Sequence, residues 1–204
     1  MSVLNNRQIE DAIGYYNLID PFDKNQLNPN SYDFRLSGKF CRAWTEITRS
    51  YDSHGWTDTR TYKNISIVLD KRDVENHLIV DDFEADKYTL GSGENILALT
   101  EEYFSFPPNI CGMVKQKSSL GRLFLSVCNG DAGWVDSGFT GQLVIELRNN
   151  SPFSITLTKG MRIGQIIFMY SGFCIDGYSG HYVDQRDFKS DKWKESLIRI
   201  GEGK

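Results

Sequence analysis

Short β-type runs separated by turn residues are the feature that most constrains the fold of this chain. Clusters of Gly, Asn, Asp, Ser and Pro stand between the runs, and this pattern is typical of an antiparallel sandwich or barrel. The stretch 41–64 is polar and aromatic without a clear period, so we expect a long excursion from the barrel there. The runs occupy residues 65–69, 95–99, 112–114, 143–147 and 163–168.

One short helix is predicted near the start of the chain. Asn5 with Gln8 three positions later fits a capping box, and Gly14 is placed to end the helix. The apolar stripe of this helix consists of Ile9, Ala12 and Ile13. At the other end, residues 177–204 are charged with interspersed aromatics, which suits either a solvated tail or a lid over a site.

Length and charge narrow the classes of function. With 204 residues, of which 40% are hydrophobic, we expect one folded domain spanning 1–204. The net charge of −4 disfavours a nucleic-acid binder, because phosphate neutralisation needs clustered cations. Residues 111–170 nevertheless hold six Lys and Arg against three Asp and Glu, a local charge of +3 that leaves −7 for the rest. Such a basic island suits a small anionic ligand.

Cysteine spacing and apolar runs bear on metals and membranes. The four cysteines and three histidines are scattered, and the His-x-Glu and Pro-Cys-x-x-Cys pattern of zinc nucleobase deaminases is absent. We therefore expect reduced thiols and no zinc site. No apolar run reaches the ~18–20 residues that a membrane helix needs, and no basic-then-apolar leader follows Met1. We expect a cytoplasmic protein without membrane contact.

Two segments carry groups that could do chemistry. Between Lys117 and Arg122, two hydroxyls, a lysine and an arginine fork could bind phosphate, although they also suit an ordinary surface turn. Glu146 stands in an apolar run, on the opposite face from its neighbours. It is a solvated side chain if that face is wet; if the face is enclosed, it needs a partner such as Arg122. Asp136 lies in a Gly-rich bend, where it could simply serve the turn.

Together these pieces resemble the dCTP deaminase branch of the dUTPase-like superfamily, and most closely its bifunctional, dUMP-forming members. The resemblance rests on Ser-Ser-x-Gly-Arg at 118–122, Ala-Gly-Trp-Val-Asp-x-Gly-Phe at 132–139 and the strand glutamate at 146. It covers nearly the whole chain, least well over 41–90. The family's early strand, late strand and closing tail are matched by residues 26–36, 159–168 and 178–185.

The resemblance implies a fold and an activity. The fold would be all-β and mainly antiparallel, a distorted jelly-roll or β-clip barrel with a short N-terminal helix. The protein would be a homotrimer with active sites at subunit interfaces. It would deaminate dCTP to dUTP without zinc, releasing ammonia, and would also release diphosphate to give dUMP, the precursor of dTMP. Mg²⁺ would enter with the phosphates and keep several waters.

The resemblance also implies roles for individual residues. Glu146 would take a proton from water and pass it toward the departing ammonia, which one carboxylate can do in two steps. Ser118 would hold the water, and Arg122 would anchor Glu146 and favour its ionised form. Asp136 would accept a hydrogen bond from the sugar 3′-hydroxyl and act on the water that releases diphosphate. The implied substrate contacts are Lys117, Ser119, Gly130, Asp131, Ala132, Gly133, Trp134, Phe139, Gln165, Tyr178, His181 and Gln185.

Three departures from the family pattern keep alternatives open. Lys117 stands where arginine is usual, Asp131 where threonine or asparagine is usual, and His181 where lysine is usual. The alternatives are a dUTPase without deaminase activity and a non-catalytic, nucleotide-binding regulatory trimer. A typical dUTPase has no glutamate matching Glu146 and ends in a Gly-rich motif that is missing here. A plain β-barrel interaction module explains the joint pattern least well.

Overall fold

The computed structural model groups the chain into two compact units. Unit 1 comprises Met1–Phe40 and Glu84–Asp187, and unit 2 comprises Cys41–Phe83 and Phe188–Lys204. The single domain predicted over 1–204 stays a prediction. The structure describes residues 2–44, 46–61, 67–128 and 132–203.

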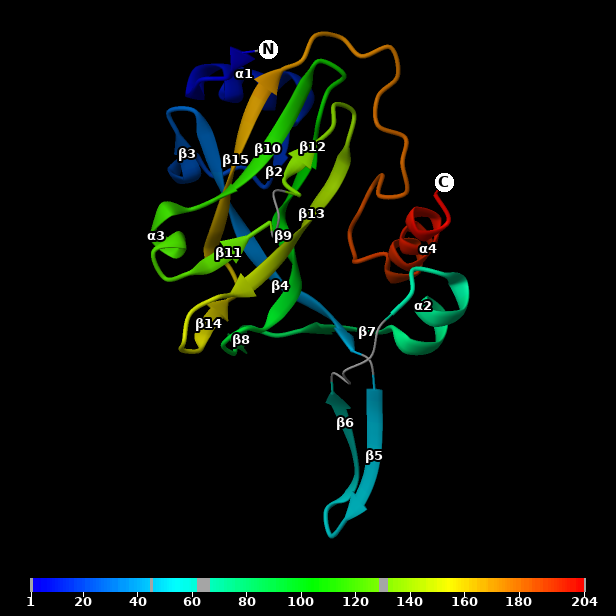
Figure 1. Ribbon diagram of the computed structural model, residues 1–204. Helices are drawn as coiled ribbons and strands as arrows, with labels where there is room; N and C mark the ends of the chain where they lie inside the picture. The colour runs from blue at the N-terminus through cyan, green and yellow to red at the C-terminus, as the bar shows by residue number, and fades with distance from the viewer. Residues whose placement is uncertain (1, 45, 62–66, 129–131, 204) are drawn as a thin grey trace. The chain divides into compact units, whose positions relative to one another are not determined.

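Strands dominate unit 1, and Figure 1 shows most of them curling into one sheet, while β8 and β14 form a separate two-stranded sheet. The strands of the chain are β1 (Ser2–Val3), β2 (Ile19–Asp20), β3 (Leu27–Asn28), β4 (Ser31–Trp44), β5 (Glu46–Asp52), β6 (Gly55–Thr61), β7 (Ile79–Glu84), β8 (Lys87–Leu90), β9 (Asn95–Ser105), β10 (Ile110–Gln116), β11 (Leu125–Val127), β12 (Trp134–Val135), β13 (Thr140–Asn149), β14 (Ile155–Thr158) and β15 (Arg162–Tyr170). The helices are α1 (Asn6–Tyr16), the 3₁₀ turn η1 (Lys24–Gln26), α2 (Lys71–His77), α3 (Ser118–Gly121) and α4 (Ser190–Gly201).

The main sheet has the order β11-β13-β9-β4-β15-β10-β12. Its neighbours β9 and β13, like β10 and β15, are antiparallel. Phe34, Phe104 and Phe168 are fully buried in unit 1. The expected all-β, mainly antiparallel fold is therefore confirmed. The short apolar runs form strands because alternate side chains can enter this core.

Capping residues and local burial explain which of the predicted helices and strands the structure contains. The capping box of Asn5 and Gln8 is present at the start of α1, as predicted. The helix does not end at Gly14; it continues to Tyr16, because Asn17 adopts the left-handed conformation (φ 51°) that closes it. The run predicted as a strand over 65–69 is irregular over 67–69, where Val68 is exposed, and its first two residues lie outside the described residues.

Unit 2 contains most of the expected excursion. Strands β5 and β6 form an antiparallel hairpin in which the rings of Tyr51 and Trp56 lie 5.1 Å apart, both largely exposed. Helices α2 and α4 also belong to this unit and contact each other. None of the helices in the described part of the chain is both long and apolar enough to cross a membrane.

Candidate active site

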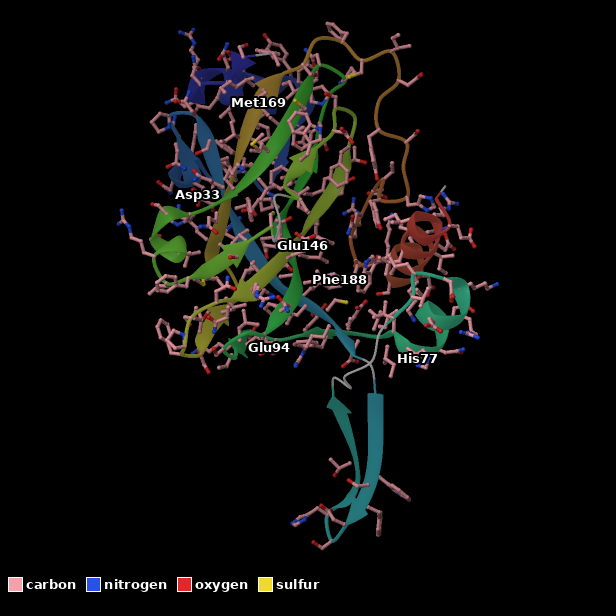
Figure 2. The ribbon with its side chains drawn as sticks, in the orientation of Figure 1. Asp33, His77, Glu94, Glu146, Met169 and Phe188 are labelled. Atoms are coloured by element: carbon pink, nitrogen blue, oxygen red, sulfur yellow. The ribbon has the colours of Figure 1, made fainter. Side chains whose placement is uncertain are left out.

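Glu146 is the predicted catalytic residue with the most unusual surroundings. On β13 it is half-buried between Ile145 and Leu147, which are buried on the other face. Figure 2 labels Glu146 on β13. Leu97 lies opposite it on β9, so Glu146 has an apolar neighbour. Its Oε2 atom is buried and has no hydrogen-bond partner among the residues that the structure describes. The Oε2 atom is thus enclosed, although the Glu146 side chain as a whole is half-buried.

Burial changes the acidity of Glu146. Its pKa is raised above the ordinary glutamate value because loss of water disfavours the charged form; a hydrogen bond from its own backbone N–H opposes this shift. A carboxyl group with a raised pKa is suited to taking up a proton and giving it back. This chemistry matches the role predicted from the sequence.

The expected anchoring of Glu146 by Arg122 is not seen among the residues that the structure describes. Arg122 is exposed at the C-cap of α3, while Oε2 of Glu146 has no partner among those residues. That Arg122 favours the ionised form of Glu146 stays a prediction, and burial in the single chain raises the pKa of Glu146. The exposure of Arg122 has a topological reason. The chain forms α3 at the surface and returns to pair with β13 only at Leu125.

The residues that would assist Glu146 share this surface helix. Lys117 is the N-cap of α3 and Leu120 is its buried side chain. Ser118 and Ser119 are exposed, as is Arg122. The hydroxyl and guanidinium groups therefore face outward from their own chain and are available to groups beyond it.

A charged cluster surrounds Asp33 on β4, on a different strand from Glu146 (Figure 2). Lys117 pairs with Oδ2 of Asp33, and Arg162 lies 3.5 Å from the same atom. Asn28 donates to Oδ1 at 3.0 Å. Because the Asp33 side chain is only 3% exposed, it holds Lys117 from inside the protein. Lys117 is thus an oriented cation rather than a loose surface lysine.

Gln165 lies beside the same cluster. Its side chain accepts a hydrogen bond from Ser31 at 2.9 Å and donates to the carbonyl of Gln116, the neighbour of Lys117, at 3.3 Å. The structure thus brings together Lys117 and Gln165, both predicted as phosphate contacts. Sequence reasoning gave no role to Asp33 or to Arg162. The early-strand motif and the basic island were the signals that contained them.

The loop predicted to read the base begins next to Glu146. The N–H of Cys128 donates to the backbone carbonyl of Glu146 at 2.9 Å. At the far end, the N–H of Val114 donates to the carbonyl of Gly133 at 2.7 Å. A Cβ on Gly133 would lie 2.5 Å from the Val114 oxygen, so this close approach requires glycine. The described ends of the loop, Cys128 and Gly133, are therefore held by β13 and β10.

Of the residues in this loop, Gly130 and Asp131 lie outside the described residues, and Ala132 is exposed. Trp134 follows on β12, and its indole Nε1 donates to Oδ1 of Asp136 at 2.9 Å. Asp136 is exposed, so its carboxylate is accessible to a ligand.

The predicted tail contacts lie close to Phe139. The rings of Phe139 and Tyr178 are 5.7 Å apart, and the N–H of Tyr178 donates to the carbonyl of Ser137 at 2.9 Å. The pKa of Tyr178 is raised, first by burial and in smaller part by the charge of Asp136. The structure therefore groups Asp136, Phe139 and Tyr178 around one bend.

Further along the tail, His181 is half-buried and Gln185 is buried. The carbonyl of Gln185 accepts a hydrogen bond from the N–H of Gln142 at 2.7 Å. A Cβ on Gly141 would lie 2.7 Å from the Gln185 nitrogen. In this conformation Gln185 fastens the tail to the start of β13.

Comparison with known proteins identifies the family. The sequence pattern described as dCTP deaminase-like matches residues 3–171. The chain belongs to this family. The resemblance to the dCTP deaminase branch is thereby confirmed.

Two relatives of this dCTP deaminase-like chain have the same name. A protein of Rhodococcus erythropolis named dCTP deaminase, dUMP-forming, is 36% identical over 168 residues, which cover 82% of this chain and 80% of the relative. A Hydrogenobaculum protein of the same name is 35% identical over 167 residues, covering 81% of each. The 2′-deoxycytidine 5′-triphosphate deaminase structure from Agrobacterium tumefaciens matches with a TM-score of 0.55 and 22% identity, covering 83% of this chain and 49% of that one. This chain thus spans about half of that solved chain, and the likeness shows the fold alone.

The dCTP deaminase-like motifs fall in three places in unit 1: Glu146, the bend of Asp136 and Phe139, and the cluster of Lys117 and Gln165. Among the residues that the structure describes, the side chain of Glu146 forms no hydrogen bond or ion pair with the other two places. One chain therefore presents the parts of the site without closing them around Glu146.

Proposed function

We propose that this chain deaminates dCTP and then releases diphosphate, giving dUMP. The family and the name shared by its relatives supply the substrate class. The observation that carries the proposal is the half-buried Glu146 side chain, whose pKa is raised by burial and whose buried Oε2 atom has no partner among the described residues. Such groups are concentrated where a protein moves protons. In balance, dCTP and two waters become dUMP, diphosphate and ammonia.

Glu146 moves two protons in the deamination, and the step needs no zinc. First it carries a proton from water to N3 of cytosine as the water oxygen bonds to C4. Then it carries the proton of the new hydroxyl to the exocyclic amine as the C4–N bond breaks. The products are a uracil ring and ammonia, and the carboxylate returns to its starting form. Ser118 holds the water for the first step.

A homotrimer with sites between subunits completes the surroundings of Glu146. Within the described part of the single chain, the Oε2 atom of Glu146 lacks a partner, and Ser118 and Arg122 are exposed. A second copy whose α3 approaches Glu146 would supply the guanidinium fork and the hydroxyl together. Closed symmetric assemblies are the common form of soluble homo-oligomers.

The remaining parts of the site suit the sugar and the base. Asp136 accepts a hydrogen bond from the 3′-hydroxyl, and it also acts on the water that releases diphosphate. Phe139 packs against the deoxyribose, which leaves no room for a 2′-hydroxyl. Backbone groups of residues 130–133 read the base edge, and Trp134 follows them. The part of the tail that belongs to unit 1, residues 177–187, closes over the nucleotide.

The triphosphate binds at the cluster around Asp33. The residues that contact the triphosphate are Lys117, Ser119, Gln165, Tyr178, His181 and Gln185. The oxygens of Asp33 are occupied by Lys117, Arg162 and Asn28, and among the described residues no three His, Cys, Asp or Glu gather as metal ligands. Mg²⁺ would therefore be bound through phosphate oxygens and water rather than through Asp33. Once bound, Mg²⁺ neutralises phosphate charge.

Product identity tests the proposal. The purified protein is incubated with Mg²⁺ and either dCTP or dUTP, and ammonia, diphosphate and nucleotides are measured by chromatography. From dCTP we expect ammonia, diphosphate and dUMP in equal amounts. Consumption of dUTP alone would support the dUTPase alternative. Binding of dCTP without turnover would support the regulatory trimer.

A further inference from the structure

The Trp134 side chain forms a hydrogen bond with the side chain of Asp136. Its Nε1 donates to Oδ1 of Asp136 at 2.9 Å. Trp134 is 50% exposed, so burial alone does not explain an indole at this position. Tryptophan N–H is a donor only, and here it meets an acceptor that bears a charge. The interaction therefore constrains the carboxylate as much as the ring.

Strand geometry makes this pair a fixed one. Trp134 and Val135 form β12, which pairs with Met113 and Gly112 of β10. Residues two apart on an extended strand point to the same face, so Trp134 and Asp136 lie on one side while the buried Val135 points to the other. The indole is held by the sheet, whereas Asp136 starts a bend. The N–H group is therefore the better fixed member of the pair.

The bend after Asp136 is closed by other contacts. The N–H of Phe139 donates to the carbonyl of Asp136 at 3.2 Å, and the Phe139 ring meets the ring of Tyr178. The backbone of the bend is thus fixed on the side away from Trp134. The Asp136 side chain could still rotate, and the hydrogen bond from the indole N–H fixes the direction of its carboxylate.

We propose that Trp134 is a positioning residue that aims the Asp136 carboxylate at the sugar 3′-hydroxyl of the bound nucleotide. The inference rests on the proposed function, in which Asp136 accepts that hydrogen bond. With Oδ1 held by the indole, Oδ2 is left for the hydroxyl. Trp134 thereby sets, through Asp136, a preference for nucleotides that carry a 3′-hydroxyl.

Equilibrium binding of dCTP and 2′,3′-dideoxycytidine triphosphate tests this inference. Trp134→Phe keeps an aromatic ring and removes the donor. We expect the wild type to prefer dCTP by about 10-fold or more, since hydrogen bonds to charged groups are worth that much. The variant should lose most of this preference through weaker dCTP binding, while binding of the dideoxy analogue stays the same.

A double-mutant cycle and a matched control separate positioning from general damage. In an Asp136→Ala background, Trp134→Phe should have no further effect on the preference. Trp56→Phe changes another exposed tryptophan, in the β5–β6 hairpin, and should leave the preference unchanged.

Each of the other results would contradict either the inference or the proposed function on which it rests. If Trp134→Phe keeps the preference, weakens both ligands equally, or multiplies with Asp136→Ala, then Trp134 does not act through Asp136. If the wild type has no preference, the role of Asp136 in the proposed function also fails. If the wild type does not bind dCTP, the proposed function itself falls.

Discussion

Glu146 has surroundings that a structural glutamate rarely keeps. A buried polar atom without a partner costs free energy that the fold must recover elsewhere, and among the described residues Oε2 of Glu146 is such an atom. The raised pKa expresses the same cost as a reluctance to ionise. A group kept under these conditions, on a strand whose other face is packed core, is well explained by proton transfer.

The pH dependence of deamination should reveal the partner of Glu146. A general base works in its ionised form, so the rate falls as pH drops through the pKa of Glu146. Burial in the chain raises this pKa, and Arg122 from a second copy would lower it. Arg122→Ala should therefore move the acidic limb of the kcat/KM profile to higher pH.

In practice, the Arg122→Ala variant should lose much more activity at pH 6 than at pH 8. Arg122→Lys, which retains the charge, should keep the limb closer to its wild-type position. An acidic limb that stays in place in Arg122→Ala would remove Arg122 from the surroundings of Glu146.

Lys117 should contribute to affinity for the triphosphate. Its ion pair with Asp33 aims it, and loss of one charge-assisted contact corresponds to roughly 10- to 100-fold in binding. Lys117→Ala should weaken dCTP binding by about that factor. Binding of dCMP, which lacks the outer phosphates, should change little. An equal loss for both ligands would place Lys117 elsewhere than at the phosphates.

At the scale of elements, local chemistry was the predictable part of the fold. The start of α1 followed from a capping box, and the runs at 95–99, 143–147 and 163–168 lie in β9, β13 and β15, as their apolar patterns predicted. The prediction of a strand at 65–69 was wrong over 67–69. An apolar run forms a strand only where the fold offers a neighbouring strand to pair with.

Contacts between distant residues were the unpredictable part of the site. Asp33 and Lys117 are 84 residues apart in sequence, and their ion pair arises only once β4 and β10 lie beside β15. The Glu146 position on an enclosed face was one of two open alternatives. The exposure of Arg122 could not be read from its spacing to Glu146, because the intervening chain leaves the sheet and returns.

Two glycines should respond to alanine in opposite ways. Gly133→Ala should destabilise the fold by about 1–3 kcal/mol, because its Cβ would overlap the Val114 carbonyl and separate β12 from β10. Gly14→Ala lies within α1 with nothing within 4 Å of its Cβ, and should stabilise the fold by up to about 1 kcal/mol. Thermal unfolding of both variants measures this contrast. A neutral Gly133→Ala would mean that the β10–β12 approach can relax.

At the scale of the whole molecule, the proposed function makes assembly part of the chemistry, because it brings Arg122 of one copy to Glu146 of another. If a site combines Glu146 of one copy with α3 of the next, two inactive variants can complement each other. Glu146→Gln keeps Arg122, and Arg122→Ala keeps Glu146. In random trimers of an equal mixture, about a quarter of the sites would contain both intact residues.

Co-refolding of these two variants should therefore restore activity toward about a quarter of the wild-type value. A mixture of Glu146→Gln with the double variant Glu146→Gln/Arg122→Ala contains no intact site and serves as the control. Activity no higher than that of the separate variants would show that both residues act within one copy, or that neither is required.

Ammonia release from saturating dCTP by Glu146→Gln, with dCTP binding measured on the same preparation, tests the central claim most directly. The amide cannot accept the proton of water, so binding should persist while ammonia release falls by roughly three orders of magnitude or more. Ammonia release at the wild-type rate would show that Glu146 is not the base and would contradict the account.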